Sequence, residues 1–203
     1  MKIIDVTKVL TEDIPLYPGD PYVLFEEITD QTGDGIVTTS KIQMGSHSGT
    51  HIDAPAHIDP DLHPANEFPL DWVQGYATVI ESQSLDESIS KLIVYSEDIK
   101  FLIIKSSEKE SIFPSITDQL AFNLKSSGIH IIGTDRLSID DGSSGLVNHQ
   151  TLLNKGVWII ENLDLSKVSR GPYRYTIAPL KISVRDGAPV RVFLSDDYKD
   201  LDF

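Results

Sequence analysis

Cysteine is absent from this chain of 203 residues, and its absence removes two kinds of structure. No disulfide can cross-link the fold, and no thiolate can bind a metal. Any metal must therefore be held by nitrogen and oxygen ligands. Cysteine usage, which often indicates the cellular compartment, is uninformative for this chain.

Long apolar runs and clusters of basic residues are also missing. No apolar run approaches the roughly 18 residues of a membrane span, and Asp5 interrupts the N-terminal stretch where a signal peptide would be apolar. The 17 basic residues are scattered among 31 acidic ones, and the resulting net charge of −14 repels phosphate backbones. We therefore expect a cytoplasmic protein that has neither a membrane nor a nucleic acid as its partner.

No repeat, low-complexity tract or linker divides the sequence, so residues 1–203 are predicted to form one domain. Helices are predicted over residues 117–127, with Ser115 or Thr117 as N-cap, and from the cap Asn148 to Lys155. A turn is expected at residues 16–20, and strands at residues 3–9, 23–28, 36–44, 75–82, 101–105, 129–132, 157–160, 173–182 and 190–194. Because the first third shows strands without helices, the pattern indicates an α/β or α+β domain with a mixed sheet rather than a doubly wound one.

Four metal-type ligands lie within one stretch, His47-Ser-Gly-Thr-His51-Ile-Asp53-Ala-Pro-Ala-His57. If residues 47–53 are extended, alternate side chains share a face, and His47, His51 and Asp53 point to one side. Gly49 on that face would leave space for a cation. One histidine alone is usually an ordinary core or surface residue, but imidazole and carboxylate together suit zinc and its first-row neighbours. The grouping therefore predicts a metal site.

Glu161 and His149 are more distant candidates. Glu161 ends the apolar run 157–160, and burial of a carboxylate costs several kcal/mol unless a cation or hydrogen bonds compensate. The alternative is that the strand surfaces at Glu161 and that water solvates the carboxylate. His149 lies at the start of a predicted helix, where it is either functional or an ordinary surface residue.

Two further histidines and two aromatic residues lie outside these motifs. His63 lies in a polar loop and His130 alternates with isoleucines in a strand, so both are predicted to have structural roles. Phe68 and Trp72 either line a pocket or belong to the core.

Together, these motifs resemble the cyclase-family metal hydrolases, whose best-known members are the bacterial kynurenine formamidases. The resemblance spans nearly the whole chain and rests on the histidine stretch 47–57, Tyr17-Pro-Gly-Asp20, Gly133-x-Asp135-x-x-Ser138-x-Asp140, and His149 followed by Glu161. It implies an α/β fold of the swivelling β/β/α type and a homodimer or homotetramer.

The resemblance also implies two divalent metal ions, zinc or alternatively manganese. The ligands of the first ion would be His47, His51, Asp53 and Glu161. The ligands of the second would be Asp53, His149 and Glu161, so that both carboxylates bridge. His57 would remain free as a proton donor and acceptor.

The implied reaction is hydrolysis of an amide C–N bond, with an aryl formamide such as N-formylkynurenine as the leading substrate. Two cations would lower the pKa of a bridging water toward neutrality, and His57 would protonate the departing nitrogen. Tyr17 replaces the tryptophan of the formamidases and either stacks on an aromatic substrate or packs against the fold. Lys105-Ser106 replaces their Arg-Thr pair, a second departure that bears on the substrate.

Two alternatives stay open at this point. The first keeps the metal and changes the reaction to opening of a cyclic amide such as isatin, or to a dehydration or cyclisation with His57 as base. The second is a non-catalytic metal-binding protein in which His57 completes the coordination sphere.

Overall fold

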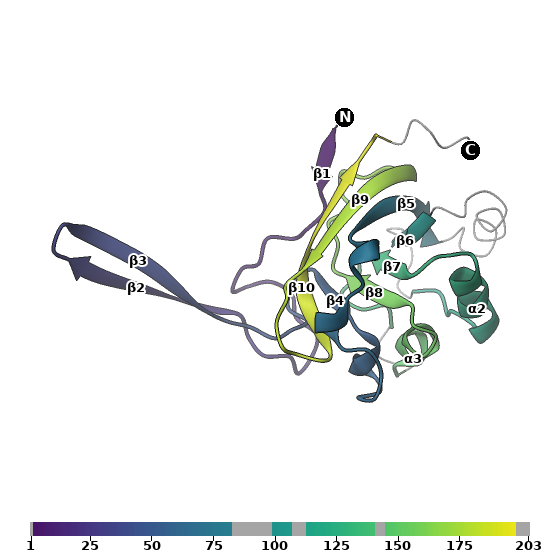
Figure 1. Ribbon diagram of the computed structural model, residues 1–203, viewed down its shortest axis with the longest axis horizontal. Coiled ribbons are helices and arrows are strands. Elements are labelled where there is room, and N and C mark those ends of the chain that lie inside the picture. The colour runs from purple at the N-terminus through teal and green to yellow at the C-terminus, as the bar shows by residue number, and fades with distance from the viewer. Residues whose placement is uncertain (1, 83–98, 107–112, 141–144, 198–203) are drawn as a thin grey trace.

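The computed structural model describes residues 2–82, 99–106, 113–140 and 145–197. Its centre is a sheet that closes on itself, in the order β10-β4-β8-β7-β6-β5-β9, with β9 paired back to β10 (Figure 1). A short strand, β1 (Ile3–Asp5), lies beside β10. The strands of the ring are β4 (His51–Asp53), β5 (Gln74–Glu81), β6 (Ile99–Lys105), β7 (Ile131–Thr134), β8 (Trp158–Glu161), β9 (Gly171–Pro179) and β10 (Gly187–Ser195).

The ring combines parallel and antiparallel pairing. Strands β5 to β8 are parallel neighbours, whereas β4, β9 and β10 join the ring through antiparallel ladders. Parallel neighbours require crossover connections, and the two described α-helices, α2 (Asp118–Ser126) and α3 (Val147–Leu153), lie in the crossovers between β6 and β7 and between β7 and β8. The predicted α/β class with a mixed sheet is thus confirmed.

Two apolar cores lie on opposite faces of the parallel strands. Along β6, Phe101 and Ile103 point into the ring, where the Phe101 ring meets that of Tyr175 on β9 with centroids 5.4 Å apart. The alternate residues Leu102 and Ile104 belong to the second core, which α2 and α3 cover. Because both faces are buried, these strands read as continuous apolar runs in the sequence.

The predicted N-cap is confirmed for one α-helix and is wrong for the other. Thr117 caps α2, and its side chain accepts a hydrogen bond from the Leu120 N–H, as predicted. The prediction that Asn148 caps the second helix is wrong, because α3 begins after the N-cap position Leu146. The Asn148 side chain instead accepts a hydrogen bond from the backbone of Ile116, a contact between distant segments that local sequence does not reveal.

The remaining boundaries are shifted by small amounts. Strand β7 begins at Ile131 rather than residue 129, and β1 ends at Asp5 rather than residue 9. The described part of the first third holds no α-helix, in line with the prediction, but residues 55–72 contain three 3₁₀ helices, η1 (Pro55–His57), η2 (Ala65–Glu67) and η3 (Leu70–Trp72). None of the described helices has the length and apolarity to cross a membrane.

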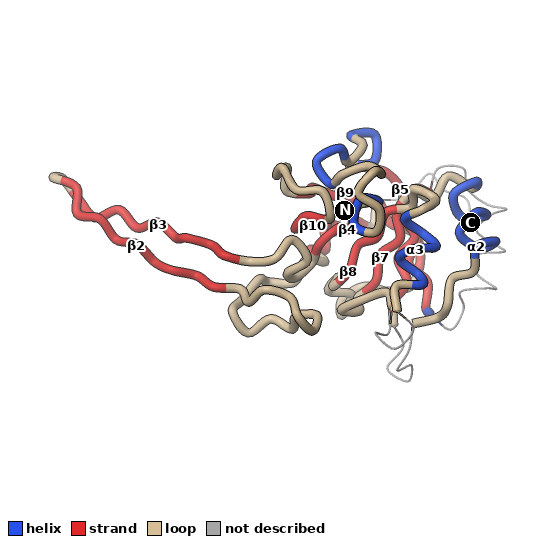
Figure 2. Tube along the Cα trace, turned by 90° about the horizontal axis from the view of Figure 1, so that it is seen from below, coloured by secondary structure: helices blue, strands red, loops and turns tan. Residues whose placement is uncertain are grey.

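A hairpin extends away from the body of the molecule. It consists of β2 (Leu24–Thr32) and β3 (Gly35–Gln43), which among the described strands pair only with each other (Figures 1 and 2). The helices α2 and α3 lie at the opposite end of the molecule. Both strands were predicted, but nothing in the sequence separated them from the central sheet.

Gly133 on β7 tests the packing of the inner core. A Cβ at this position would lie 2.7 Å from the Phe101 ring and 2.9 Å from the Leu163 side chain, both of which are fully buried. We therefore expect Gly133→Ala to lower the free energy of unfolding by about 1–3 kcal/mol. Thermal unfolding should show a lower Tm, whereas Gly35→Ala, where a Cβ would meet open space, should change Tm little. Equal Tm values for the two variants would contradict the close packing of Phe101 and Leu163 against Gly133.

Candidate metal centre

The structure brings the five predicted metal ligands and His57 to one place. Strand β4 carries His51 and Asp53 on one face, while the intervening Ile52 points into the core. In the antiparallel register of β4 and β8, His51 lies directly opposite Glu161. The remaining three residues arrive on other segments, His149 on α3, His47 on the loop before β4 and His57 at the end of η1.

Asp53 lies between two sets of imidazole nitrogens. Its Oδ1 is 2.8 Å from His47 Nδ1 and 3.2 Å from His51 Nε2. Its Oδ2 faces the other way, 3.4 Å from His149 Nε2. The ligand atoms of His47, His51 and Asp53 form one group within 4.8 Å, and those of Asp53, His149 and Glu161 form a second.

Glu161 connects the same two sets from the other side. One carboxylate oxygen is 3.5 Å from His51 Nε2, and the other is 3.4 Å from His149 Nε2. The second oxygen also accepts a hydrogen bond of 2.6 Å from the Ile139 backbone. Only 4% of Glu161 is exposed, so the alternative of a solvated carboxylate at the strand end is wrong.

The route by which His47 reaches the site differs from the prediction. Residues 45–50 form turns rather than a strand, because β4 begins only at His51. Gly49 has a φ of 69°, and a Cβ there would meet Leu10 and Ile14 rather than the imidazoles. The expectation that Gly49 opens space for a cation is therefore wrong.

The glycine that gives His47 its space is Gly187, at the start of β10. A Cβ at Gly187 would lie 2.9 Å from the His47 ring and 2.7 Å from the carbonyl oxygen of Ile52. No motif singled out this residue, because its contact with His47 depends on the pairing of β10 with β4.

The two central carboxylates are ionised although they are buried. Burial favours the neutral acid, but the adjacent imidazoles, His51 foremost, hold the pKa of Asp53 well below its usual range. Burial and Asp53 together favour neutral Glu161, yet His149 and His51 outweigh them and keep its pKa lowered. Asp53 Oδ2 has no hydrogen-bond partner among the described residues.

The imidazoles respond in the opposite direction. Burial alone would lower the pKa of His51, but Asp53 and Glu161 outweigh it and raise the pKa to about 10. For His149, the contact with Asp140 and the nearby carboxylates of Asp53 and Glu161 overcome burial and raise the pKa to about 12. These cationic rings supply positive charge beside the two carboxylates. The unpartnered Asp53 oxygen and the nitrogen and oxygen donors fit a divalent cation in that role.

The far nitrogens of the two buried histidines have fixed partners. His51 Nδ1 donates to the Gly49 carbonyl at 2.9 Å, and His149 Nδ1 lies 2.7 Å from Asp140 Oδ2. In both rings Nε2 is therefore the atom that faces the centre. Asp140 is the last residue of the Gly133-x-Asp135-x-x-Ser138-x-Asp140 motif. The sequence did not predict its contact with His149, because that contact depends on where α3 begins.

Asp186 is a further carboxylate that the sequence did not reveal. Its Oδ2 is 3.0 Å from His47 Nε2 and accepts a short hydrogen bond from the Ser46 hydroxyl. His47, His57 and Asp186 form a third group of possible ligands. The residue lies in the turn before β10, and no local pattern distinguishes it from other surface aspartates.

His57 lies beside the centre without sharing its hydrogen bonds. Its ring centroid is 4.4 Å from that of His47 and 5.7 Å from that of His149. Within the described chain, no hydrogen bond to the His57 ring is seen. Burial, aided by the neighbouring imidazoles, lowers the pKa of His57 against the opposing charge of Asp53, so the ring is neutral at pH 7.

A cavity of about 210 Å³ opens onto five of the six site residues, while Asp53 lies behind them and does not line it. Its outer wall includes Tyr17, 38% exposed, in a turn whose hydrogen bond runs from the Asp20 N–H to the Tyr17 carbonyl at 3.0 Å. Gly19 has a φ of 101°, which explains the glycine of this predicted turn. The other lining residues are Asp20, His47, His51, His57, Leu137, Ser138, Leu146, His149 and Glu161.

The remaining candidates lie away from this cavity. His63 pairs with Glu67 at the surface, and His130 stacks on Trp72 with ring centroids 4.3 Å apart. Phe68 packs against the inner core together with Trp72. Neither aromatic lines the cavity, so the core assignment holds for both.

Comparison with known proteins places the chain in a family. Residues 4–141 match the family described as "Putative cyclase", and the chain belongs to this family. It is 32% identical over 201 residues to a kynurenine formamidase of Bacillus mycoides, covering 94% of this chain and 96% of that one. Among solved structures, a "predicted metal-dependent hydrolase" from Bacillus stearothermophilus is 32% identical, with a TM-score of 0.71 and 95% and 97% of the two chains covered.

A more distant structure shares the fold alone. Isatin hydrolase A from Labrenzia aggregata is 22% identical, with a TM-score of 0.73 and 95% and 93% of the two chains covered. The family match and the two relatives of 32% identity confirm the predicted family and the prediction of an enzyme, an amidohydrolase. The metal-dependent relatives and the clustered ligands indicate a divalent metal, while the number and identity of the ions stay predictions.

Asp140 provides a test of the centre that leaves every predicted ligand in place. We expect Asp140→Asn to weaken metal binding by about 10- to 100-fold, because His149 loses the carboxylate that orients its ring. Titration calorimetry with zinc on metal-free protein would measure the change. Asp59→Asn, in a loop outside the cavity, is the matched control. Unchanged affinity in Asp140→Asn would show that His149 is not held to the metal through this contact.

Proposed function

We propose that this protein is a binuclear metal enzyme that hydrolyses an aryl formamide. The observation that carries the proposal is the position of Asp53, whose two oxygens face different sets of imidazole nitrogens. A carboxylate in this arrangement suits a bridge between two cations. Glu161, which also reaches toward both His51 and His149, supports the same interpretation.

The proposed ligand sets are those that the resemblance to the family implies. His47, His51, Asp53 and Glu161 would hold one ion, and Asp53, His149 and Glu161 the other. Zinc is the proposed metal and manganese the alternative, because only nitrogen and oxygen donors are present. When bound, such ions polarise a carbonyl and lower the pKa of water toward neutrality.

His57 is the proposed acid and base of the reaction. Its lowered pKa keeps the ring neutral at pH 7, and its freedom from hydrogen bonds leaves a ring nitrogen able to accept a proton from the attacking water. The same nitrogen can then deliver the proton to the departing amine as the C–N bond breaks. A new C–O bond forms on the carbonyl carbon, so that a formamide yields formate and an amine.

The walls of the cavity support an aromatic substrate. Tyr17 offers a ring at the outer wall, and Leu137 and Leu146 add apolar surface beside it. The volume of about 210 Å³ suits one small substrate rather than a polymer. The name of the formamidase relatives points in the same direction.

A turnover screen of metal-loaded protein tests the reaction class. The substrates are N-formylkynurenine, isatin as a cyclic amide, and a small aliphatic formamide. We expect the highest kcat/KM with the aryl formamide. Preferential opening of isatin would assign the cyclic-amide reaction instead, and absence of turnover with all three would overturn the proposed function.

His57→Ala separates proton transfer from metal binding. We expect kcat to fall by about 10²- to 10⁴-fold, the usual contribution of general acid–base catalysis, while the metal content stays unchanged. Because the pKa of His57 lies below its ordinary value, protonation of His57 should lower the wild-type rate only at a pH below about 6.5, the ordinary pKa of histidine. Loss of metal from the variant would identify His57 as a ligand, which its place beside His47 and Asp186 allows.

Tyr17→Ala tests the aryl part of the proposal. An aromatic ring stacked on Tyr17 contributes roughly 0.5–1.5 kcal/mol, so KM for the aryl formamide should rise by about 2- to 15-fold. KM for the aliphatic formamide should change little, and Tyr17→Phe, which keeps the ring, is the matched control. Equal losses on both substrates would show that Tyr17 merely supports the turn.

A further inference from the structure

His47 contacts a carboxylate with each of its ring nitrogens. His47 Nδ1 lies 2.8 Å from Asp53 Oδ1, toward the centre, and His47 Nε2 lies 3.0 Å from Asp186 Oδ2, on the other side of the ring. His51 and His149 have the opposite arrangement, because their Nδ1 atoms have fixed partners and their Nε2 atoms face the centre. Of the three predicted ligand histidines, His47 alone turns Nδ1 toward the central carboxylates.

Two consecutive residues, Asp186 and Gly187, hold the His47 ring in this orientation. A Cβ at Gly187 would lie 2.9 Å from His47 Cε1 and 3.3 Å from His47 Nδ1, so a larger residue would displace this edge of the ring. Asp186 accepts the contact from the other nitrogen, and its Oδ2 also accepts a hydrogen bond from the Ser46 hydroxyl. The glycine therefore provides the space for the ring, and the carboxylate determines where Nε2 points.

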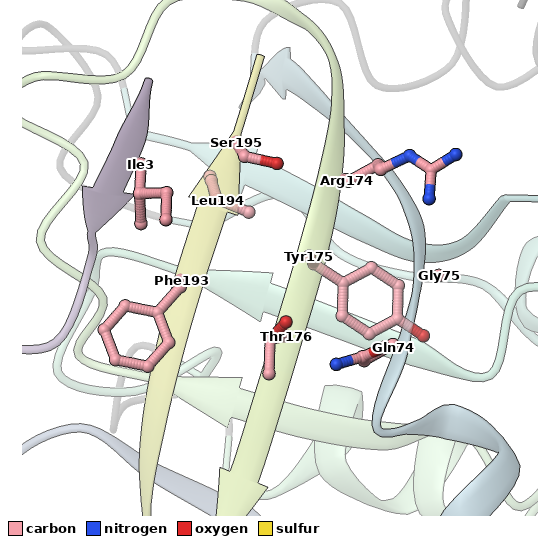
Figure 3. Close-up of a pocket in the computed structure, with 9 residues that line it drawn as sticks. All are labelled: Ile3, Gln74, Gly75, Arg174, Tyr175, Thr176, Phe193, Leu194 and Ser195. Atoms are coloured by element: carbon pink, nitrogen blue, oxygen red, sulfur yellow. The ribbon is translucent and has the colours of Figure 1, made fainter. Parts of the chain in front are cut away.

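Asp186 is fixed in space because it immediately precedes β10. The Ala54 N–H donates to the Asp186 carbonyl at 2.9 Å, and Gly187 pairs with Asp53 in the ladder between β10 and β4. At its other end, β10 lies between β1 and β9, and Figure 3 shows Phe193 on β10 with both neighbouring strands beside it. Three ladders thus hold the strand that positions Asp186.

The chemistry of the two contacts determines which nitrogen of His47 can bind a metal. An aspartate is ionised at neutral pH and only accepts hydrogen bonds, so Nε2 beside Asp186 carries a hydrogen. A cation bound by His47 and Asp53 replaces the hydrogen on Nδ1, whereas the one on Nε2 stays with Asp186. Metal-binding histidines commonly donate their second N–H to a carboxylate in this way, which fixes the tautomer and the ring.

We propose that Asp186 is the positioning residue of His47, which keeps the hydrogen on Nε2 and so presents the lone pair of Nδ1 to the metal. The inference rests on the proposed function, because it requires a metal at the group of His47, His51 and Asp53. It assigns a role to a residue outside the proposed ligand sets. It also gives His47 a different donor atom from those of the other two histidines.

The group of His47, His57 and Asp186 offers a rival arrangement, in which Asp186 would itself bind the ion. The surroundings of Asp186 favour the positioning role. Its side chain is 42% exposed, so water can satisfy the carboxylate without a cation. Asp53 Oδ2, in contrast, is buried and has no hydrogen-bond partner among the described residues. The rival would use Nε2 of His47, the nitrogen on the side of Asp186, and this difference can be measured.

Nitrogen-15 NMR of zinc-loaded wild-type protein distinguishes the two arrangements. Long-range proton–nitrogen spectra show, for each imidazole, which nitrogen carries a hydrogen and which one binds the metal, and through-bond connection to the assigned backbone identifies each ring. We expect the hydrogen on Nε2 of His47, but on Nδ1 of His51 and His149. A hydrogen on Nδ1 of His47, or a metal bound to His57, would overturn the proposal.

Asp186→Ala removes the acceptor and leaves every proposed ligand in place. We expect the dissociation constant for zinc to rise by about 10- to 100-fold, the usual effect of removing such a partner, in titration calorimetry of metal-free protein. Asp186→Asn keeps an oxygen that can accept from Nε2 and should lose less affinity than Asp186→Ala. Asp30→Asn, which removes the same charge from the outlying hairpin, is the matched control and should bind zinc as the wild type does.

The possible results separate the role of Asp186 from the metal centre itself. A wild type that binds no zinc would remove the basis of the proposed function. Zinc binding of wild-type affinity in both Asp186→Ala and Asp186→Asn would overturn the role of Asp186 alone. Circular dichroism of the metal-free proteins checks that each variant is folded, and the NMR result on the wild type decides the donor atom of His47 even if Asp186→Ala does not fold.

Discussion

Two buried carboxylates, Asp53 and Glu161, determine the arrangement of the residues around them. Neither is solvated, so each must meet positive charge or hydrogen-bond donors within the fold. The imidazoles of His51 and His149 supply the charge, and the Ile139 backbone donates to Glu161. Removal of any one of these partners leaves charge uncompensated in the interior, which is more costly than loss of an ordinary contact. The same requirement makes the site receptive to divalent cations.

The closed ring positions these carboxylates through a very short strand. β4 has three residues, of which the outer two face the centre while Ile52 anchors the strand in the inner core. Its neighbours are β8 on one side and β10 on the other. Immediately after Glu161, Asn162 adopts a φ of 58° and its carbonyl accepts a hydrogen bond from Thr50. The chain therefore turns away from the centre immediately after Glu161.

Sequence reasoning found the ligand types but not the path of the chain. His51 and Asp53 could be predicted because alternation in a strand is a local property, and Glu161 because an apolar run leads to it. The role assumed for Gly49 was wrong, and Gly187 and Asp186 were missed, because the space around His47 is set by the pairing of β10 with β4. Asn148 fitted the usual residue preference for an N-cap, but its side chain instead accepts a hydrogen bond from the backbone N–H of Ile116. Local patterns thus predicted which residues have side chains suited to bind a metal. The positions of those side chains depend on contacts between distant segments, which local patterns do not reveal.

The position of β4 also has a consequence for the order of events during biosynthesis. The ribosome completes β4 early, but both of its ladder partners, β8 and β10, belong to the last part of the chain. Until they emerge, β4 has no place in the sheet, and His51 and Asp53 lack Glu161. An ion captured by the nascent chain would have only part of its ligands and could still exchange with the surrounding medium. The full set of ligands is therefore assembled only after translation of nearly the whole chain, when the ring closes.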